Sequence, residues 1–326
     1  MPESPSDLTE HTTRHTIDID APAEEVFAVI ADAESWPVVF PPTVHVRRKA
    51  EPDGAELLDI WASAAGNVKA WRSRRELDHD HLTASFTQIV SSAPVASMSG
   101  TWRVTTNDAG LATVTLDHRF TAVADNADSA AWIERAIEAN STAELAALAQ
   151  TVSGKRSGAY VSLEFSDTLA IDSAAQPVFD FLHQAQLWPQ RLSHVARVDL
   201  TKQDNAQVLE MDTVSNTGDA HTTRSFRVVA DRFELAYKQT VVPDGFLAHY
   251  GKWSLEETAD ATLATSYHRV HLNLTTLGPR LGVTERHQIE QRVRDALGGN
   301  SLRTLHAAKV FVESDHSVAA ASRVSS

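Results

Sequence analysis

The chain has 326 residues, 42 % of them hydrophobic and 22 % charged, an ordinary globular composition that argues against disordered, collagen-like and coiled-coil classes. It contains no cysteine, which excludes disulfides, thiolate nucleophiles and cysteine-ligated metal sites. Its formal net charge of −14 makes nucleic acid and anionic membranes poor partners, and no apolar stretch is long enough to span a membrane.

The first elements follow a polar, acidic segment, Met1–Asp7, which lacks the basic and apolar regions of a signal peptide, so we expect a cytoplasmic protein. A strand is predicted over His15–Ile19, and apolar residues at helical spacing predict a helix over Pro22–Ala31. Trp36-Pro37 is expected to close this helical segment. Six more strands are predicted at Val44–Lys49, Leu57–Ala62, Val68–Leu77, Leu82–Ile89, Gly100–Thr105 and Ala112–Ala122. A long helix over Ser129–Thr151 follows them.

The sequence then repeats itself at a shift of about 152 residues. The ordered matches include Trp36-Pro37 with Trp188-Pro189, Arg72-Ser73-x-Arg75 with Arg224-Ser225-x-Arg227, Gly100-x-Trp102 with Gly251-x-Trp253, His118-Arg119 with His268-Arg269, and Asn140-Ser141 with Asn300-Ser301. Chance does not produce so many matches in order. We therefore predict a duplicated domain, with one copy over residues 1–152 and the other over residues 153–326.

The second copy is expected to open with a strand over Tyr160–Leu169 and to end in a helix over Val283–Glu313, bent at Gly298-Gly299. Val152–Gly158 has the composition of a linker, and a frayed tail is expected after Ser314. Each half is thus predicted to be α+β, a curved antiparallel sheet wrapped around one long C-terminal helix, with a cavity between them.

This order of elements resembles the helix-grip fold of START and Bet v 1-like proteins. Glu34–Phe40 and Val68–Arg75 look like the bacterial aromatase/cyclases of type II polyketide synthases, and the duplication resembles the di-domain members. Phe40–Val46, Ile60–Ala62 and Ala96–Trp102 are similar to members that act on C9-reduced chains. The resemblance implies cyclisation of the first ring, of the C7–C12 type, its dehydration–aromatisation, or both, on a poly-β-ketone held by an acyl carrier protein among other type II polyketide synthase components.

Alternation along the strand Val68–Leu77 places Trp71, Ser73 and Arg75 on one face and Arg72 and Arg74 on the other. Tryptophan prefers burial, so the first set is expected to face the cavity. In the functional interpretation, Arg75 holds a ketone or enolate oxygen and Ser73 helps to move protons. The alternative is an ordinary Arg75–carboxylate pair at the sheet edge.

In the second copy, His221, Thr223, Ser225 and Arg227 share the inward face. Arg227 and Ser225 are the counterparts of Arg75 and Ser73. Because Thr223 replaces Trp71, we expect a more polar and wider cavity whose substrate differs from that of the first. His221 is either a proton shuttle or a polar residue at the cavity mouth.

Four further aromatic residues are candidates for substrate binding. Trp36 either forms an aromatic wall or packs in the core, and for Trp188 we favour core packing. His118 and His268 occupy matching strand positions, where a hydrogen-bonded histidine is a commoner finding than an acid/base group. Trp102 and Trp253 are expected to be core residues.

No metal, nicotinamide or other cofactor is predicted, because the histidines lack ligand spacing and no glycine-rich phosphate loop occurs. Arg47, Arg48 and Lys49 with Arg72 and Arg74 form either a basic edge that docks the acidic carrier protein or a solvated face. The halves carry net charges of −12 and −2, so an acidic partner meets less repulsion at the second. A non-catalytic carrier of lipid or polyketide is the alternative function, and the two inward Ser-Arg pairs favour the enzyme.

Overall fold

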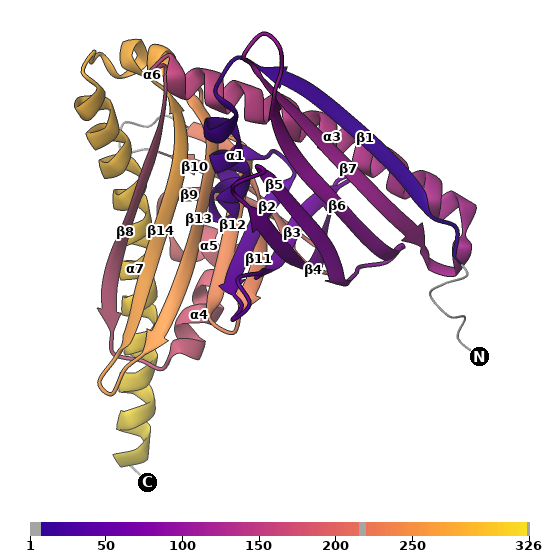
Figure 1. Ribbon diagram of the computed structural model, residues 1–326. Coiled ribbons are helices and arrows are strands. Elements are labelled where there is room, and N and C mark those ends of the chain that lie inside the picture. The colour runs from indigo at the N-terminus through magenta and orange to yellow at the C-terminus, as the bar shows by residue number, and fades with distance from the viewer. Residues whose placement is uncertain (1–7, 215–219, 325–326) are drawn as a thin grey trace. The chain divides into compact units, whose positions relative to one another are not determined.

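The computed structural model describes the backbone of residues 8–214 and 220–324, and their side chains except in 214–221 and 315–324. The chain divides into two compact units, the first ending at Gly158 and the second beginning at Ala159 (Figure 1). Each unit has its own seven-stranded antiparallel sheet.

In the first unit the sheet order is β1-β7-β6-β5-β4-β3-β2. Its elements are β1 (His11–Ile19), α1 (Ala23–Ala31), the 3₁₀ helix η2 (Ala33–Ser35), α2 (Trp36–Val39), β2 (Thr43–Ala50), β3 (Glu56–Ala64), β4 (Asn67–Asp78), β5 (Thr83–Val90), β6 (Val95–Thr106), β7 (Ala112–Ala122), η3 (Val123–Asp125) and α3 (Ala127–Arg156). The first strand therefore closes the sheet beside the last one, and every other strand pairs with its neighbour in sequence.

The second unit has the same arrangement, with the sheet order β8-β14-β13-β12-β11-β10-β9. Its elements are β8 (Tyr160–Ile171), α4 (Ala175–His183), η4 (Ala185–Leu187), α5 (Trp188–Arg191), β9 (Val195–Lys202), β10 (Gln207–Val214), β11 (Ala220–Asp231), β12 (Glu234–Val241), β13 (Phe246–Glu257), β14 (Thr262–Asn273), α6 (Leu274–Leu281) and α7 (Arg286–Val324). In Figure 1, α7 runs along the sheet formed by β8, β14 and β13. The predicted α+β arrangement and its seven strands per half are confirmed.

Several predicted boundaries are wrong. Trp36-Pro37 begins the short helix α2 instead of closing α1, because proline is well tolerated in a first helical turn. The expected linker is helical as far as Arg156, and the division between the two units falls after Gly158. Helix α7 runs unbroken through Gly298-Gly299 and continues past Ser314, and α6 was not foreseen.

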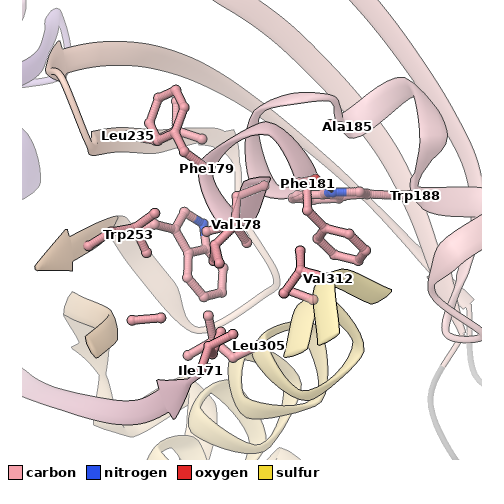
Figure 2. Packing of buried hydrophobic residues seen from close by; sticks show 14 of the residues in the cluster. Ile171, Val178, Phe179, Phe181, Ala185, Trp188, Leu235, Trp253, Leu305 and Val312 are labelled. Carbon is pink, nitrogen blue, oxygen red and sulfur yellow. Dashed lines mark hydrogen bonds between the residues drawn. The ribbon is translucent and has the colours of Figure 1, made fainter. Parts of the chain in front are cut away.

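Figure 2 shows the core that seats the short helix of the second unit. Val178 and Phe181 of α4 pack with Trp253 of β13 and with Leu305 and Val312 of α7. Leu305 is fully buried, and burying such a side chain stabilises the fold by about 1.5–3 kcal/mol. A matching cluster fixes α1 in the first unit. Each short helix therefore has a defined position at one end of its sheet.

Two glycines of the repeat allow an aromatic ring to approach the backbone of the sheet closely. Gly100 pairs with His118 and Gly251 pairs with His268. A Cβ atom on Gly100 would lie 2.5 Å from Cζ of Phe86, and one on Gly251 would lie 2.4 Å from Cζ of Tyr237. These distances leave no room for a side chain, so the motif Gly-x-Trp marks where the rings rest.

We predict that Gly100→Ala lowers the free energy of unfolding by about 1–3 kcal/mol, because the added Cβ collides with the backbone carbonyl of Asp117 as well as with the Phe86 ring, and both must move. The control is Gly299→Ala, at an exposed site in α7 with nothing within 4 Å of the added Cβ, which should raise stability by about 0.5–1 kcal/mol. Urea denaturation measures both. A Gly100→Ala protein as stable as wild type would contradict the packing.

Candidate active site

The first unit contains a cavity of about 180 Å³ with Ile133 and Ile137 of α3 and inward residues of the sheet in its wall. Lys69, Trp71, Ser73 and Arg75 of β4 all line it. On the same strand, Arg72 bonds to Asp59 and Arg74 to Asp53, and both cations are partly exposed. The predicted alternation of β4 is therefore confirmed, with the serine and the buried arginine on the cavity side.

Arg75 joins the sheet to the end of helix α1. Its Nε donates to Glu56 at 2.9 Å, Nη1 to the carbonyl of Ile30 at 3.2 Å and Nη2 to the carbonyl of Ala31 at 2.7 Å. The guanidinium also lies 5.2 Å from the centre of the Trp36 ring. The C-terminal carbonyls of a helix attract cations, so this arginine caps α1. The predicted alternative, in which Arg75 pairs with a carboxylate, is therefore confirmed with Glu56, and Arg75 also borders the cavity.

Arg227 makes the same clamp in the second unit with a different partner. Nη1 donates to Oε1 of Gln207 at 2.9 Å and to the carbonyl of His183 at 3.3 Å, and Nη2 donates to the carbonyl of Leu182. Trp188 lies 5.1 Å from this guanidinium. A neutral amide thus stands where the first unit has a carboxylate.

This exchange changes the charge of the two cavities. Burial lowers the pKa of Arg75, and the Glu56 carboxylate opposes that shift. The neighbouring guanidinium groups hold the pKa of Glu56 below its usual range, despite the opposing effect of its burial. Burial lowers the pKa of Arg227 to about 9, so this group is still a cation at neutral pH. The second cavity consequently has the less compensated positive charge.

The second cavity, of about 140 Å³, is smaller than the first. Thr223, Ser225 and Arg227 line it, and polar side chains form more of its wall, as predicted. The expected widening is wrong, because the rings of Tyr237, His249 and His268 cluster with centroids 5.3–6.5 Å apart and fill the space. The side chain of His221 lies outside the described residues.

Trp36 and Trp188, which follow the short helices, pack in the interior and also form part of a cavity wall. Trp36 lines the first cavity and donates from Nε1 to the carbonyl of Ile30 at 3.0 Å. Trp188 is 6 % exposed, belongs to the core, lines the second cavity and bonds to the carbonyl of Phe181. Trp102 and Trp253 are buried as predicted, and each also reaches a cavity wall.

The two matching histidines have different surroundings. His118 lines the first cavity beside Phe86, and its buried Nδ1 has no hydrogen-bond partner in the described part of the chain. In the second cavity, Nδ1 of His268 lies 3.0 Å from Nε2 of His249, and its Nε2 lies 2.7 Å from Oγ of Ser301. Burial lowers the pKa of both His118 and His268 to about 4. Both imidazoles are neutral bases at pH 7.

The basic edge does not present free cations. Every member pairs with a carboxylate: Arg47 and Arg72 with Asp59, Arg48 with Glu56 and Glu34, Lys49 with Glu51, and Arg74 with Asp53 and Glu76. This pairing is what the solvated-face interpretation expects, and the docking interpretation stays a prediction. Within the ranges that the structure describes, no three His, Asp or Glu side chains are grouped to hold a metal ion. Nor is any helix there long and apolar enough to cross a membrane.

Known proteins share this duplicated architecture. Residues 10–153 match the family model described as polyketide cyclase/dehydrase and lipid transport. The granaticin polyketide synthase bifunctional cyclase/dehydratase of Streptomyces violaceoruber is 38 % identical, and the alignment covers 92 % of this chain and 94 % of that protein. The chain belongs to the di-domain polyketide aromatase/cyclases.

Two further comparisons support this membership. The actinorhodin polyketide synthase bifunctional cyclase/dehydratase of Streptomyces coelicolor is 36 % identical, over 92 % of this chain and 96 % of the relative. The crystal structure of the di-domain ARO/CYC BexL from the BE-7585A pathway is 42 % identical, with a TM-score of 0.78 over 93 % of this chain and 99 % of that one. The helix-grip fold predicted from the resemblance is confirmed.

Sequence reasoning missed several residues of this aromatase/cyclase. Glu56 and Gln207 are the cross-strand partners of Arg75 and Arg227, and strand register is not visible in the sequence. His249 and Tyr237 were also missed. Each lies two residues from a repeat match, Gly251 and Gln239 respectively, and that spacing on a strand indicates the same inward face. Asn300 and Ser301 match Asn140-Ser141 in the repeat, and both also line the second cavity.

We predict that Arg75→Ala lowers the free energy of unfolding by about 3–5 kcal/mol, because it removes the buried partner of Glu56, which keeps only the partly exposed Arg48, and leaves the end of α1 uncapped. Glu56→Gln should cost less, since an amide holds the equivalent arginine in the second unit. Arg72→Ala, which removes a partly exposed pair on the outward face of β4, is the control and should cost less than about 1 kcal/mol. If denaturant titrations showed that Arg75→Ala and Arg72→Ala lower the free energy of unfolding equally, the proposed role of Arg75 in holding α1 to the sheet would be contradicted.

A second prediction concerns pH. The His118 imidazole titrates near pH 6.5 when unfolded and near 4 when folded, so between these values the unfolded chain binds more protons and stability falls as the pH falls. Between pH 7 and pH 5, we expect the free energy of unfolding of His118→Leu to fall by about 2 kcal/mol less than that of the wild type. The free energy of unfolding at both pH values tests this. Identical losses would show that the pKa of His118 is ordinary.

Proposed function

We propose that this di-domain aromatase/cyclase closes and dehydrates the first ring of a poly-β-ketone bound to an acyl carrier protein, by C7–C12 cyclisation on a C9-reduced chain. The observation that carries the proposal is the pair of cavities, each with a buried arginine and a serine on the inward face of one strand. Relatives with the same two units are named bifunctional cyclase/dehydratases.

In this proposal the cavity wall chooses the reaction. A long polyketide has many carbon pairs that can react, and a shaped cavity brings one pair together. The flat walls contributed by Trp36, Trp71 and Trp102 suit a chain that becomes planar as it cyclises. Exclusion of water by the apolar wall suppresses competing enolates. Loss of water then gives an aromatic ring, whose stability drives the sequence of steps.

The arginines retain donors for a substrate oxygen. A guanidinium has five N–H groups, and the bonds of Arg75 to protein leave one hydrogen on Nη1. The bonds of Arg227 leave its Nε–H and one hydrogen on Nη2. Such a group can stabilise the negative charge that develops on a carbonyl oxygen during aldol closure. Ser73 and Ser225 are assigned to proton movement beside it.

Unpartnered polar atoms favour catalysis over transport. In the first cavity Oε1 of Gln88 and Nδ1 of His118 are buried without a hydrogen bond, and in the second Oε1 of Gln239 is. Leaving such atoms unpaired costs about 1–3 kcal/mol each, which a ligand with oxygens along its length would recover. A carrier of lipids would need apolar walls at these positions.

The partners and location follow from this chemistry. The substrate reaches the protein on an acidic acyl carrier protein, which we place with the other type II polyketide synthase components in the cytoplasm. Because every cation of the basic edge in the first unit is paired, docking there has no free charge to use. The less acidic second half, with a net charge of −2, repels an acidic carrier less.

We predict that Ser73→Ala reduces the yield of aromatised product at least tenfold when the intact protein is combined with a minimal polyketide synthase and a ketoreductase, since it removes only the hydroxyl. The control, Arg74→Ala, alters the neighbouring outward residue and should leave the product unchanged. Chromatography of the products measures both. Wild-type yield from Ser73→Ala would remove this serine from the site.

We also predict that exhaustive chelation and omission of nicotinamide leave the aromatisation step intact, once the reduced chain is supplied. The chain carries no cysteine ligand and no glycine-rich phosphate loop. The comparison is product yield before and after chelation. Activity that is lost and then restored by an added metal would contradict this expectation.

A further inference from the structure

The second cavity contains a chain of hydrogen-bonded side chains that begins at His249. Nε2 of His249 lies 3.0 Å from Nδ1 of His268, and Nε2 of His268 lies 2.7 Å from Oγ of Ser301 and 3.1 Å from Oγ of Ser266. Both imidazoles line the cavity, and their residues are 4 % and 2 % exposed. The four side chains come from three elements, β13, β14 and α7, so the tertiary fold alone brings them together.

The connectivity favours one arrangement of protons. Nδ1 of His249 has no hydrogen-bond partner among the residues that the structure describes. If this nitrogen is the free base, Nε2–H of His249 donates to Nδ1 of His268, and Nε2–H of His268 donates to Ser301. Each bond then has one donor and one acceptor. A proton taken up at Nδ1 of His249 is stabilised by the neutral imidazole behind it.

The first cavity lacks this chain. Gly100 faces His118 and Gly251 faces His268, and the residues two positions earlier on β6 and β13 are Met98 and His249. Met98 lines the first cavity but carries no base, and His118 stands there with its buried Nδ1 unpartnered. The duplication has therefore produced one cavity with a single imidazole and another with a coupled pair.

We propose that His249 is the base of the second cavity and that the His249–His268 pair carries out the elimination of water there. This inference rests on the proposed function, which supplies a cyclised β-hydroxy ketone. Nδ1 of His249 removes the proton from the carbon beside the carbonyl, and the C–H electrons form the enolate, whose oxygen faces the cation of Arg227. The enolate electrons then form the C=C bond as the C–O bond breaks, and the imidazolium returns the proton to the leaving hydroxyl, which departs as water. No oxidant or reductant is needed.

The surroundings keep the pair neutral until the substrate arrives. Burial is the main cause that lowers the pKa of His268 to about 4 and that of His249 well below its usual value, and each group is a base at pH 7. The groups near the pair are Tyr237 on β12, Arg227 on β11, Asp167 on β8 and Arg294 on α7. Asp167 and Arg294 bond to each other at 2.6 Å, so their charges largely cancel at His268.

Two substitutions at one position separate chemistry from packing. His249→Gln retains an N–H that can donate to Nδ1 of His268 but carries no base, and His249→Met installs the side chain of the first cavity. We expect both to lower the elimination rate on the order of 100-fold, with the cyclised, hydrated product accumulating. His287→Gln, the same substitution at an exposed histidine of α7, is the matched control and should eliminate water at the wild-type rate.

The assay uses the intact protein with a minimal polyketide synthase and a ketoreductase, and it follows hydrated and dehydrated products over time. Denaturant titration confirms that each variant is folded. Wild-type elimination by His249→Gln would overturn the proposal, because a hydrogen bond to His268 would then be all that His249 supplies. If the wild-type protein itself does not change the products, the proposed function fails instead, so the two failures are distinguishable.

Discussion

A buried guanidinium fastens the short helix to the sheet in each half of this protein, and the cavity depends on that attachment. Arg75 and Arg227 donate to the last carbonyls of α1 and α4, and the rings of Trp36 and Trp188 cover them. The indole nitrogens bond to the same helices, at Ile30 and Phe181. One cation therefore satisfies the end of a helix, positions an aromatic wall and reaches the cavity.

The cost of burying a cation explains why so many groups surround it. A guanidinium taken out of water needs several acceptors to offset its desolvation. Each unit supplies two helix carbonyls, to which the first unit adds the carboxylate of Glu56 and the second the amide of Gln207. The neutral partner leaves more positive charge at the second cavity. Under the proposed function, this charge is what stabilises a developing enolate in the second cavity.

Duplication gave two copies of one scaffold whose differences lie on the cavity walls. Trp71 corresponds to Thr223, Met98 to His249 and Phe86 to Tyr237, and each change makes the second wall more polar. Polar rings packed together also reduce its volume from about 180 to about 140 Å³. Under the proposed function, the larger cavity selects one ring closure and the smaller one holds a ring already formed beside the His249–His268 pair.

The sequence by itself determined the duplication, the order of strands and helices, and the face of β4 that meets the cavity. These features are local or periodic: strand alternation places Trp71, Ser73 and Arg75 together, and a fixed shift of about 152 residues reveals the second copy. The resemblance of its motifs also placed the chain in its family, which the comparisons show. Helix ends were less well predicted, because Asn126 caps α3 earlier than expected and α7 continues through two glycines.

The tertiary structure alone decided which side chains meet across strands and helices. The partners Glu56 and Gln207 follow from register, and register is set by the packing of whole sheets. The contact of His249 with His268 and Ser301 joins residues of three elements. Whether Arg75 stands alone or in an ion pair likewise depends on a residue 19 positions away. Sequence periodicity gives the face on which a residue lies, and only the folded chain gives its neighbour.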